Sequence, residues 1–396
     1  MTVRNGREFL SIPGPTVVPD SVLGAMHHPA IDIYSGKLEG ITHSCLEDLP
    51  KIFGTQGQAY IYAANGHGAW EAAVTNVLNR GDKILVLESG RFAIGWGQAA
   101  EVLGVEMEIL PGSLRRAVDP AQVEERLRAD TDGSIKAILV VQVDTASGVV
   151  NDLPAIRRAI DAAGHGALLM VDAVASLATM PFEMDAWGID VAVSGSQKGL
   201  MTPPGLSFAA AGPRAKAAHQ TADLKTHYWD WTFREGELHY QKYCGTPPEH
   251  HLFGLRQALD MIFEEGLENV FARHRLLAGA VRRAVGAWGQ GGAVEFNITE
   301  PSERSDSVTT ILVNEGHDAG DLIAYCENKC GVVLGIGICD LVGKAFRIAH
   351  MGHVNAPMIL GTLATVEVGL AALGMPHGRG GVQAAIDWLG EQVKPD

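Results

Sequence analysis

The sequence predicts an α/β fold in which a mostly parallel sheet lies between layers of helices. Short runs that are apolar throughout recur along the chain, such as KILVLESG at 83–90 and AILVVQVD at 137–144. Helix-forming stretches separate these runs, and in LPAIRRAIDAAG (153–164) apolar residues recur every three or four positions. Strands without polar alternation are typical of parallel sheets that helices cover on both faces.

The order of the elements predicts two domains. Strands are expected at 83–90, 137–144, 167–174, 190–197 and 205–212, and helices at 94–103, 120–128 and 153–163. A strand-like IYAA precedes a Gly-rich turn, AANGHGAWEAA at 63–73, that opens another helix. A helical pattern from 252 to 288 then leads to a strand at 307–313 and helices at 318–330 and 356–373. We expect a large domain over residues 1–255 and a smaller α+β domain, begun by the long connecting helix, over residues 256–396.

Composition narrows the class of protein. The net charge of −15 argues against a nucleic-acid partner and against binding to an anionic membrane. No apolar run approaches the roughly 20 residues of a membrane helix, and the N-terminal segment has no signal-peptide pattern. Five cysteines are an odd number in a long chain, which does not suit a disulfide framework, and Cys326 and Cys330 lack the matching His/Cys pair elsewhere that a metal site needs. We therefore expect a cytoplasmic enzyme without a metal ion.

Two charged residues follow neighbouring predicted strands. Asp172 ends the run in VDAV, and Lys198 stands in SGSQK after the next strand, so both are expected at one edge of the sheet. A carboxylate at a strand end is also an ordinary helix cap or ion-pair partner. Pyridoxal 5′-phosphate, however, needs a lysine to bind its aldehyde and a carboxylate beside its pyridine nitrogen. Backbone N–H groups near Gly66 and Gly68, at a helix N-terminus, suit its phosphate.

Four motifs extend this interpretation to the whole chain: VDAVASL, SGSQKGLMTPPGL, YCGTPPEH and FRIAHMGHVN, with SIPGPTVVPD near the N-terminus. Together they resemble the class V aminotransferases of fold type I, nearest to the serine–glyoxylate and alanine–glyoxylate enzymes, with the aspartate–glyoxylate type also possible. The resemblance implies a large domain with a mostly parallel seven-stranded sheet, pyridoxal 5′-phosphate as cofactor, and a homodimer with shared active sites.

The resemblance also assigns roles to single residues. Lys198 corresponds to the lysine that binds the cofactor and moves protons, and Asp172 to the partner of the pyridine nitrogen. Arg347 corresponds to the clamp for the substrate carboxylate, since a guanidinium grips a carboxylate with two parallel hydrogen bonds. The remaining assignments are Val174 and Phe92 on the two ring faces, Thr145 near the phenolic oxygen, Gly66, His67 and Gln197 on the phosphate, and Tyr243 and Thr246 on the phosphate of the neighbouring subunit.

The implied reaction moves the amino group of serine, aspartate or alanine to glyoxylate in a ping-pong mechanism. A dicarboxylic donor needs a second cation, for which Arg91, His67 and His250 are candidates. The chain departs from the family at Ile33–Tyr34, where Tyr34 is expected near the substrate entrance, and at Cys244–Gly245. Alternatives are a pyruvate-accepting aminotransferase, a cysteine desulfurase that uses Cys339, and a non-catalytic binding protein, from which Lys198 or Asp172 would be absent.

Overall fold

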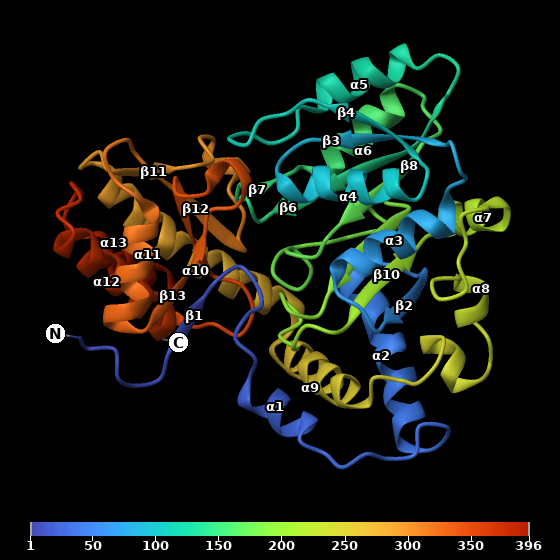
Figure 1. Cartoon of the computed structure of the whole chain (residues 1–396), viewed down its shortest axis with the longest axis horizontal. Helices are drawn as coiled ribbons and strands as arrows, with labels where there is room; N and C mark the ends of the chain where they lie inside the picture. The colour runs from blue at the N-terminus through green and yellow to red at the C-terminus, as the bar shows by residue number, and fades with distance from the viewer. Residues whose placement is uncertain (1, 395–396) are drawn as a thin grey trace.

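The larger sheet has seven strands and lies in the right-hand part of the molecule (Figure 1). The computed structural model describes residues 2–394. Along the sheet the order is β2 (Gln58–Tyr62), β10 (Ser207–Ala211), β9 (Val191–Gly195), β8 (Leu168–Asp172), β5 (Ile135–Val141), β3 (Lys83–Leu87) and β4 (Glu106–Leu110). Strand β10 runs antiparallel to both of its neighbours, and the other pairs are parallel. The predicted fold class is confirmed.

Alternate residues of each strand enter two different apolar cores. In β3, Leu85 and Leu87 pack with residues of α2 (Lys37–Phe53), α5 (Pro120–Ala129), α6 (Leu153–Ala162) and α9 (Glu249–Glu265). Ile84 and Val86 pack on the opposite face with residues of α3 (Gly66–Val77), α4 (Arg91–Val102) and α7 (Pro213–Thr221). Burial on both faces is the reason that these strands read as apolar throughout.

A second sheet forms the smaller part of the molecule. Its order is β1 (Phe9–Ser11), β13 (Val332–Ile336), β14 (Ala345–Ala349), β12 (Val308–Val313) and β11 (Val294–Phe296). Helices α10 (Leu267–Gly289), α12 (Ala356–Ala372) and α13 (Gly381–Gln392) pack on it. Strand β1 pairs in parallel with β13, so the N-terminal arm joins this sheet, whereas the sequence prediction counted the arm with the large domain.

The predicted helix over 252–288 is wrong as a single element. The chain forms α9 and α10, which meet at Gly266, where φ is 84°. A positive φ favours glycine and interrupts the helical hydrogen bonds, so α9 ends at this residue and α10 begins after it. The predicted domain boundary at 255/256 falls inside α9. The helix expected at 318–330 is α11 (Ala319–Tyr325) followed by a π-helical turn, η3 (Cys326–Cys330).

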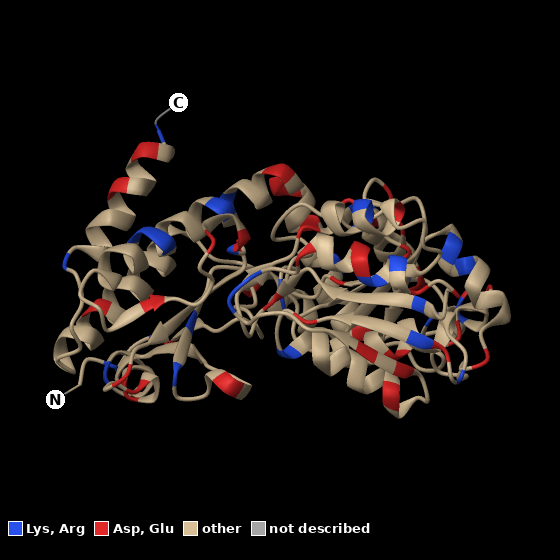
Figure 2. Cartoon of the chain, turned by 90° about the horizontal axis from the view of Figure 1, so that it is seen from above, with Lys and Arg blue, Asp and Glu red and all other residues tan. Residues whose placement is uncertain are grey.

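Charged residues of both signs are interspersed over the two parts of the chain (Figure 2). Within residues 2–394 no helix is long and apolar enough to cross a membrane. In the same described part, no three His, Cys, Asp or Glu side chains lie together as they would around a metal ion. The five cysteines form no disulfide, and Cys326 is buried in the core of the smaller part.

Candidate active site

A cavity of about 230 Å³ lies where β8 and β9 end, close to the N-terminus of α3. This is the position at which α/β sheets bind ligands, because loops diverge there from the carboxyl ends of the strands. Eight of the predicted site residues line the cavity: Gly66, His67, Phe92, Thr145, Asp172, Val174, Gln197 and Lys198. Eight further residues line it that the sequence analysis did not assign: Gly14, Pro15, Asn65, Trp70, Val141, Val143, Ala175 and Pro204.

The Asp172 carboxylate is fixed by two donors at the end of β8. The Trp70 indole Nε1 donates to Oδ2 over 2.7 Å, and the Val174 backbone N–H donates to Oδ1 over 2.7 Å. Burial raises the pKa of Asp172 to about 6, although both hydrogen bonds and the charge of Lys198 favour the ionised form. The carboxylate is therefore ionised and held in one orientation at pH 7–8.

Lys198 lies in the loop after β9, with only 9% of its surface exposed. Its ammonium donates to the Pro13 carbonyl, and the Thr16 hydroxyl donates to the Lys198 carbonyl over 2.9 Å. Residues 13–16 thus cross over the lysine, and Gly14, with φ of 100°, leaves the space that the lysine side chain fills. Burial, helped by the charge of Arg347, lowers the pKa of Lys198 to about 8, which brings its neutral amine within reach of physiological pH.

The N-terminus of α3 forms one end of the cavity. Asn65 caps the helix, since its Oδ1 accepts from the His67 N–H over 3.1 Å. The Gly66 N–H has no acceptor among residues 2–394, and a Cβ at Gly66 would lie 3.2 Å from Val174. Gly68 does not line the cavity: its N–H donates to the Asn65 carbonyl, and a Cβ there would lie 2.6 Å from the Ala64 Cβ and 3.0 Å from Trp229. The absence of a side chain at Gly68 therefore allows close packing at the start of α3.

Gln197 supplies a further polar group to the lining of the cavity. Its Oε1 is buried and has no hydrogen-bond partner in the described part of the chain. A buried polar atom without a partner is costly, and the two ends of an amide are interchangeable in assignment, so the side chain suits an anion that needs a donor. The free Gly66 N–H at a helix N-terminus suits the same anion.

The walls of the cavity are set by Phe92 and Thr145. Phe92 is the second residue of α4, and its backbone N–H donates to the buried carboxylate of Asp144 over 2.8 Å. Burial raises the pKa of Asp144, while donors from Ala146, Phe92 and Ala93 and the charge of Arg347 favour its ionised form. The Thr145 hydroxyl has no hydrogen-bond partner among residues 2–394, so it is available to a ligand. Sequence reasoning missed Asp144, which anchors Phe92.

Arg347 reaches toward this region from β14 of the second sheet. Its Nε donates to the Ile336 carbonyl over 2.7 Å, and its Nη1 donates to the Thr145 carbonyl over 2.8 Å. Nη2 has no acceptor within the described residues. Burial lowers the pKa of Arg347 to about 10, and the guanidinium stays charged at neutral pH. Arg347 does not line the cavity itself, but it is hydrogen-bonded to the backbone of Thr145, which does.

Besides Gly68 and Arg347, three further predicted site residues do not line the cavity of their own chain. Tyr34 is 73% exposed, and Thr246 is exposed. Tyr243 is buried, and its hydroxyl bonds the Thr42 hydroxyl over 2.8 Å. His239 links the two segments, because one ring nitrogen bonds Thr42 over 2.8 Å and the other bonds the Ile33 carbonyl over 2.6 Å. The segments that carry Tyr34, Tyr243 and Thr246 therefore lie together.

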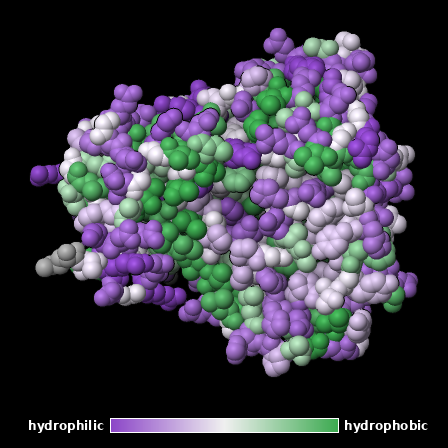
Figure 3. Space-filling model, viewed as in Figure 1, coloured by the Kyte–Doolittle hydropathy of each residue, from purple (hydrophilic) through white to green (hydrophobic). Residues whose placement is uncertain are grey.

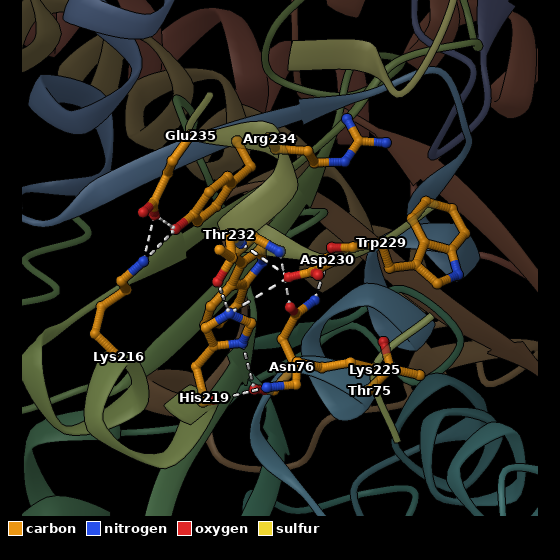
Figure 4. A network of polar contacts seen from close by, with 12 residues as sticks. Thr75, Asn76, Lys216, His219, Lys225, Trp229, Asp230, Thr232, Arg234 and Glu235 are labelled. Atoms are coloured by element: carbon orange, nitrogen blue, oxygen red, sulfur yellow. Dashed lines mark hydrogen bonds and ion pairs between the residues drawn. The ribbon is translucent and has the colours of Figure 1, made fainter. Parts of the chain in front are cut away.

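The segment that leads to Tyr243 is anchored on α3 (Figure 4). Asn76 donates to the Trp229 carbonyl over 2.9 Å and accepts from the Trp231 N–H over 3.0 Å, just before and within α8 (Trp231–Arg234). His219 bonds both the Asn76 carbonyl, over 3.0 Å, and the Thr232 hydroxyl, over 2.8 Å. One helix thus supports the glycine turn at its start and this segment near its end.

The three candidates for a second cationic side chain that binds a dicarboxylic substrate differ in position and charge. His67 lines the cavity, and burial and the nearby Arg91 charge lower its pKa, so it is neutral at pH 7–8. Arg91 begins α4 beside Phe92, and its Nη1 donates to Gln98 over 3.2 Å. His250 bonds the His28 carbonyl over 2.8 Å and does not line the cavity. Arg91 carries a permanent charge, but it is exposed and also does not line the cavity. Cys339 is exposed in a short turn and also lies outside the cavity lining.

The cavity fits pyridoxal 5′-phosphate. The unpaired Gln197 amide and Gly66 N–H suit its phosphate, Asp172 suits its pyridine nitrogen, and Lys198 has a lowered pKa suited to binding an aldehyde. A mostly parallel sheet with these groups at its strand ends defines a pyridoxal-phosphate-dependent enzyme.

Comparison with known proteins narrows the class. Residues 14–340 match the family model described as aminotransferase class-V. Over 397 residues, 98% of each chain, 41% are identical to serine–glyoxylate aminotransferase of Methylorubrum extorquens. L-aspartate–glyoxylate aminotransferase of Paracoccus denitrificans is 39% identical over 94% of each chain. This chain belongs to the class V aminotransferases, and the predicted family, enzyme class and cofactor are confirmed.

Solved structures agree on the fold. Pyridoxamine–pyruvate aminotransferase from Mesorhizobium loti superposes with a TM-score of 0.89 and 26% identity, covering 99% of this chain and 100% of the other. Cysteine desulfurase from Thermococcus onnurineus reaches a TM-score of 0.70 at 16% identity, over 90% and 93% of the chains, and shares the fold alone.

Proposed function

We propose that this enzyme transfers the amino group of a small L-amino acid to glyoxylate, giving glycine and a 2-oxo acid. The observation that carries the proposal is the placement of Lys198 and Asp172 on neighbouring strand ends, with Arg347 bonded to the rim of the same cavity. Relatives that match the chain almost end to end are named as glyoxylate aminotransferases with serine or aspartate as donor.

Lys198 is the group that moves protons in this scheme. When bound, pyridoxal 5′-phosphate supplies the electron sink that stabilises the charge left on the substrate Cα. The Lys198 amine takes the proton from that carbon and later returns one, for which a pKa near 8 is well matched. Asp172, fixed by Trp70 and Val174, holds the proton on the pyridine nitrogen.

Arg347 orients the substrate. Its Nη2, which has no acceptor in the described part of the chain, is the nitrogen that faces a substrate carboxylate, while Nε and Nη1 remain on backbone carbonyls. Those two bonds fix the plane of the guanidinium before substrate arrives, which reduces the entropy lost on binding.

A spectroscopic experiment tests the cofactor chemistry. The purified chain is expected to be yellow, and Lys198→Ala is expected to lose both the bound-cofactor absorption band and the activity, because the buried lysine that lines the cavity is removed. Lys136→Ala, an exposed lysine in β5, is the matched control and should keep both. A colourless protein that takes up no cofactor would overturn the proposal.

A panel of donors and acceptors tests the substrates. Serine, aspartate and alanine are each paired with glyoxylate and with pyruvate, and glycine or alanine formation is followed. We expect glyoxylate to be the better acceptor and the double-reciprocal plots to be parallel, as in two separate half-reactions. A higher kcat/KM for pyruvate would favour the pyruvate-accepting alternative, in line with the pyruvate-named structural neighbour.

We also propose that the enzyme is a homodimer with shared active sites. Tyr34 and Thr246 are exposed and lie outside their own chain's cavity on adjoining segments, as expected of residues that serve the cavity of a second copy. Tyr243 is buried with its hydroxyl on Thr42 and supports the same segments from within the chain. Figure 3 also shows a band of apolar residues along the junction of the two parts of the molecule, the kind of surface that a second copy covers. Of the three, Tyr34 and Thr246 are exposed, and each carries a hydroxyl.

A further inference from the structure

Trp70 occupies a central place in the cavity that the reaction scheme does not by itself require. Its side chain is only 3% exposed, in the second turn of α3, and its indole lines the cavity. Its ring centre lies 4.4 Å from that of His67 and 6.4 Å from that of Phe92. The indole thus lies between the phosphate end and the ring-stacking wall, and its one polar atom points to Asp172.

The bond between Trp70 and Asp172 joins a neutral donor to a buried carboxylate. At 2.7 Å it has the length of a charge-assisted hydrogen bond, which favours the ionised carboxylate. The second donor, the Val174 N–H, occupies the other oxygen, so the two donors together fix the carboxylate plane. Each oxygen accepts one bond from the protein and keeps a lone pair for a further donor.

The charged groups around Asp172 have opposite effects on its ionisation. Asp144 lies on the strand β6 (Val143–Asp144) and disfavours a second negative charge, whereas Lys198 favours it. Arg347 faces the same group of residues from β14, and His67 lies against Trp70 on α3. Because the positive charge of Lys198 is shared between two carboxylates, the two donors decide how firmly Asp172 stays ionised.

We propose that Trp70 is a positioning residue that keeps the Asp172 carboxylate ionised and aimed at the pyridine nitrogen of the cofactor. The inference rests on the proposed function. Trp70 contacts Asp172 through its indole N–H, and its effect on the reaction passes through that carboxylate. The aromatic contacts to His67 and Phe92 hold the indole in the plane that the hydrogen bond requires.

The chain offers a matched pair of substitutions. Trp70→Phe keeps an aromatic ring in the cavity wall but removes the donor. Trp96→Phe makes the same chemical change at a fully buried tryptophan that stacks on Trp70 with centroids 6.2 Å apart and does not line the cavity. The cofactor-stripped full-length chain is titrated with pyridoxal 5′-phosphate. We expect Trp70→Phe to raise the dissociation constant about tenfold and Trp96→Phe to change it less than threefold.

The pH dependence of the melting temperature gives a readout that needs neither activity nor cofactor. The folded pKa of Asp172, about 6, is above its usual value of 3.8, so this group costs stability as pH rises through that interval. Removing the indole donor raises the folded pKa further. The loss of Tm caused by Trp70→Phe should therefore widen between pH 5 and pH 8, whereas that caused by Trp96→Phe should stay constant.

A double-mutant cycle distinguishes loss of the Trp70–Asp172 hydrogen bond from a general loss of packing. In an Asp172→Asn background, Trp70→Phe should change the dissociation constant less than twofold, since the charged partner is gone. Equal effects of Trp70→Phe with and without the Asp172 carboxylate, or a pH-independent loss of Tm, would overturn the inference. Failure of every form of the chain to bind cofactor would instead overturn the proposed function, and the Tm experiment would still decide the Trp70–Asp172 interaction.

Discussion

Arg347, the proposed clamp for the substrate carboxylate, is also fixed within the chain, because two of its nitrogens donate to the carbonyls of Ile336 and Thr145. Lysine carries the same charge but presents one point donor in place of a planar fork. We expect Arg347→Lys to raise the KM of the amino donor about 10- to 100-fold, with a much smaller change in the dissociation constant of the cofactor. Steady-state kinetics and a cofactor titration measure the two constants. Equal changes in both would place Arg347 outside the substrate site.

At the scale of single residues, the charged residues of the cavity could be predicted from the sequence. Lys198 and Asp172 stand out because charged residues are unusual at the ends of apolar strands, and the structure brings both into the cavity. Trp70 and Asp144 were missed for a physical reason. A tryptophan in a helix is ordinary in sequence, and only the fold shows that Trp70 donates to Asp172. Asp144 ends the apolar run AILVVQVD and so carried the same signal as Asp172, but only the fold shows that it accepts from the Phe92 N–H.

At the scale of elements, helix α3 has the glycine turn of the cavity at its N-terminus and contacts the segment around α8 near its C-terminus. Asn76 makes the second contact through its hydrogen bonds to Trp229 and Trp231. We expect Asn76→Ala to lower the free energy of unfolding by about 2–5 kcal/mol, because the Trp229 carbonyl and the Trp231 N–H lose a buried partner. Denaturant titration of the full chain measures the change. Glu71→Ala, on the exposed side of the same helix, is the control and should cost less than about 0.5 kcal/mol.

Element boundaries were predicted well where the apolar pattern had one period. The helix expected at 120–128 is α5 (Pro120–Ala129), and the strand expected at 307–313 is β12 (Val308–Val313). The apolar pattern from 252 to 288 did not reveal the break between α9 and α10, because apolar residues continue on both sides of Gly266. The first helix ends there because Gly266 has a positive φ. Strand β1 was missed because three residues, half exposed, carry no recognisable period.

At the scale of the whole molecule, the proposed dimer makes a prediction about mixed subunits. Lys198→Ala and Thr246→Ala chains are co-expressed with different tags, and the mixed dimers are isolated. If Thr246 serves the partner's cavity, each mixed dimer has one intact site and about half of the wild-type activity. Thr145→Ala in place of Thr246→Ala is the control, because Thr145 lines the same cavity as its own Lys198 and no intact site results. Restoration that is equal in both pairings, or absent from both, would contradict shared sites.

The position of β1 has a consequence for the order in which the enzyme is built. The Ser11 hydroxyl bonds the Ala349 carbonyl, 338 residues further along the chain, and β1 pairs with β13, which is synthesised late. Contacts of such long sequence separation form slowly, after local structure. Residues 13–16, which cross over Lys198, directly follow β1. An emerging chain can therefore complete its seven-stranded sheet before its reactive lysine is covered, and the active site matures only when nearly the whole polypeptide has left the ribosome.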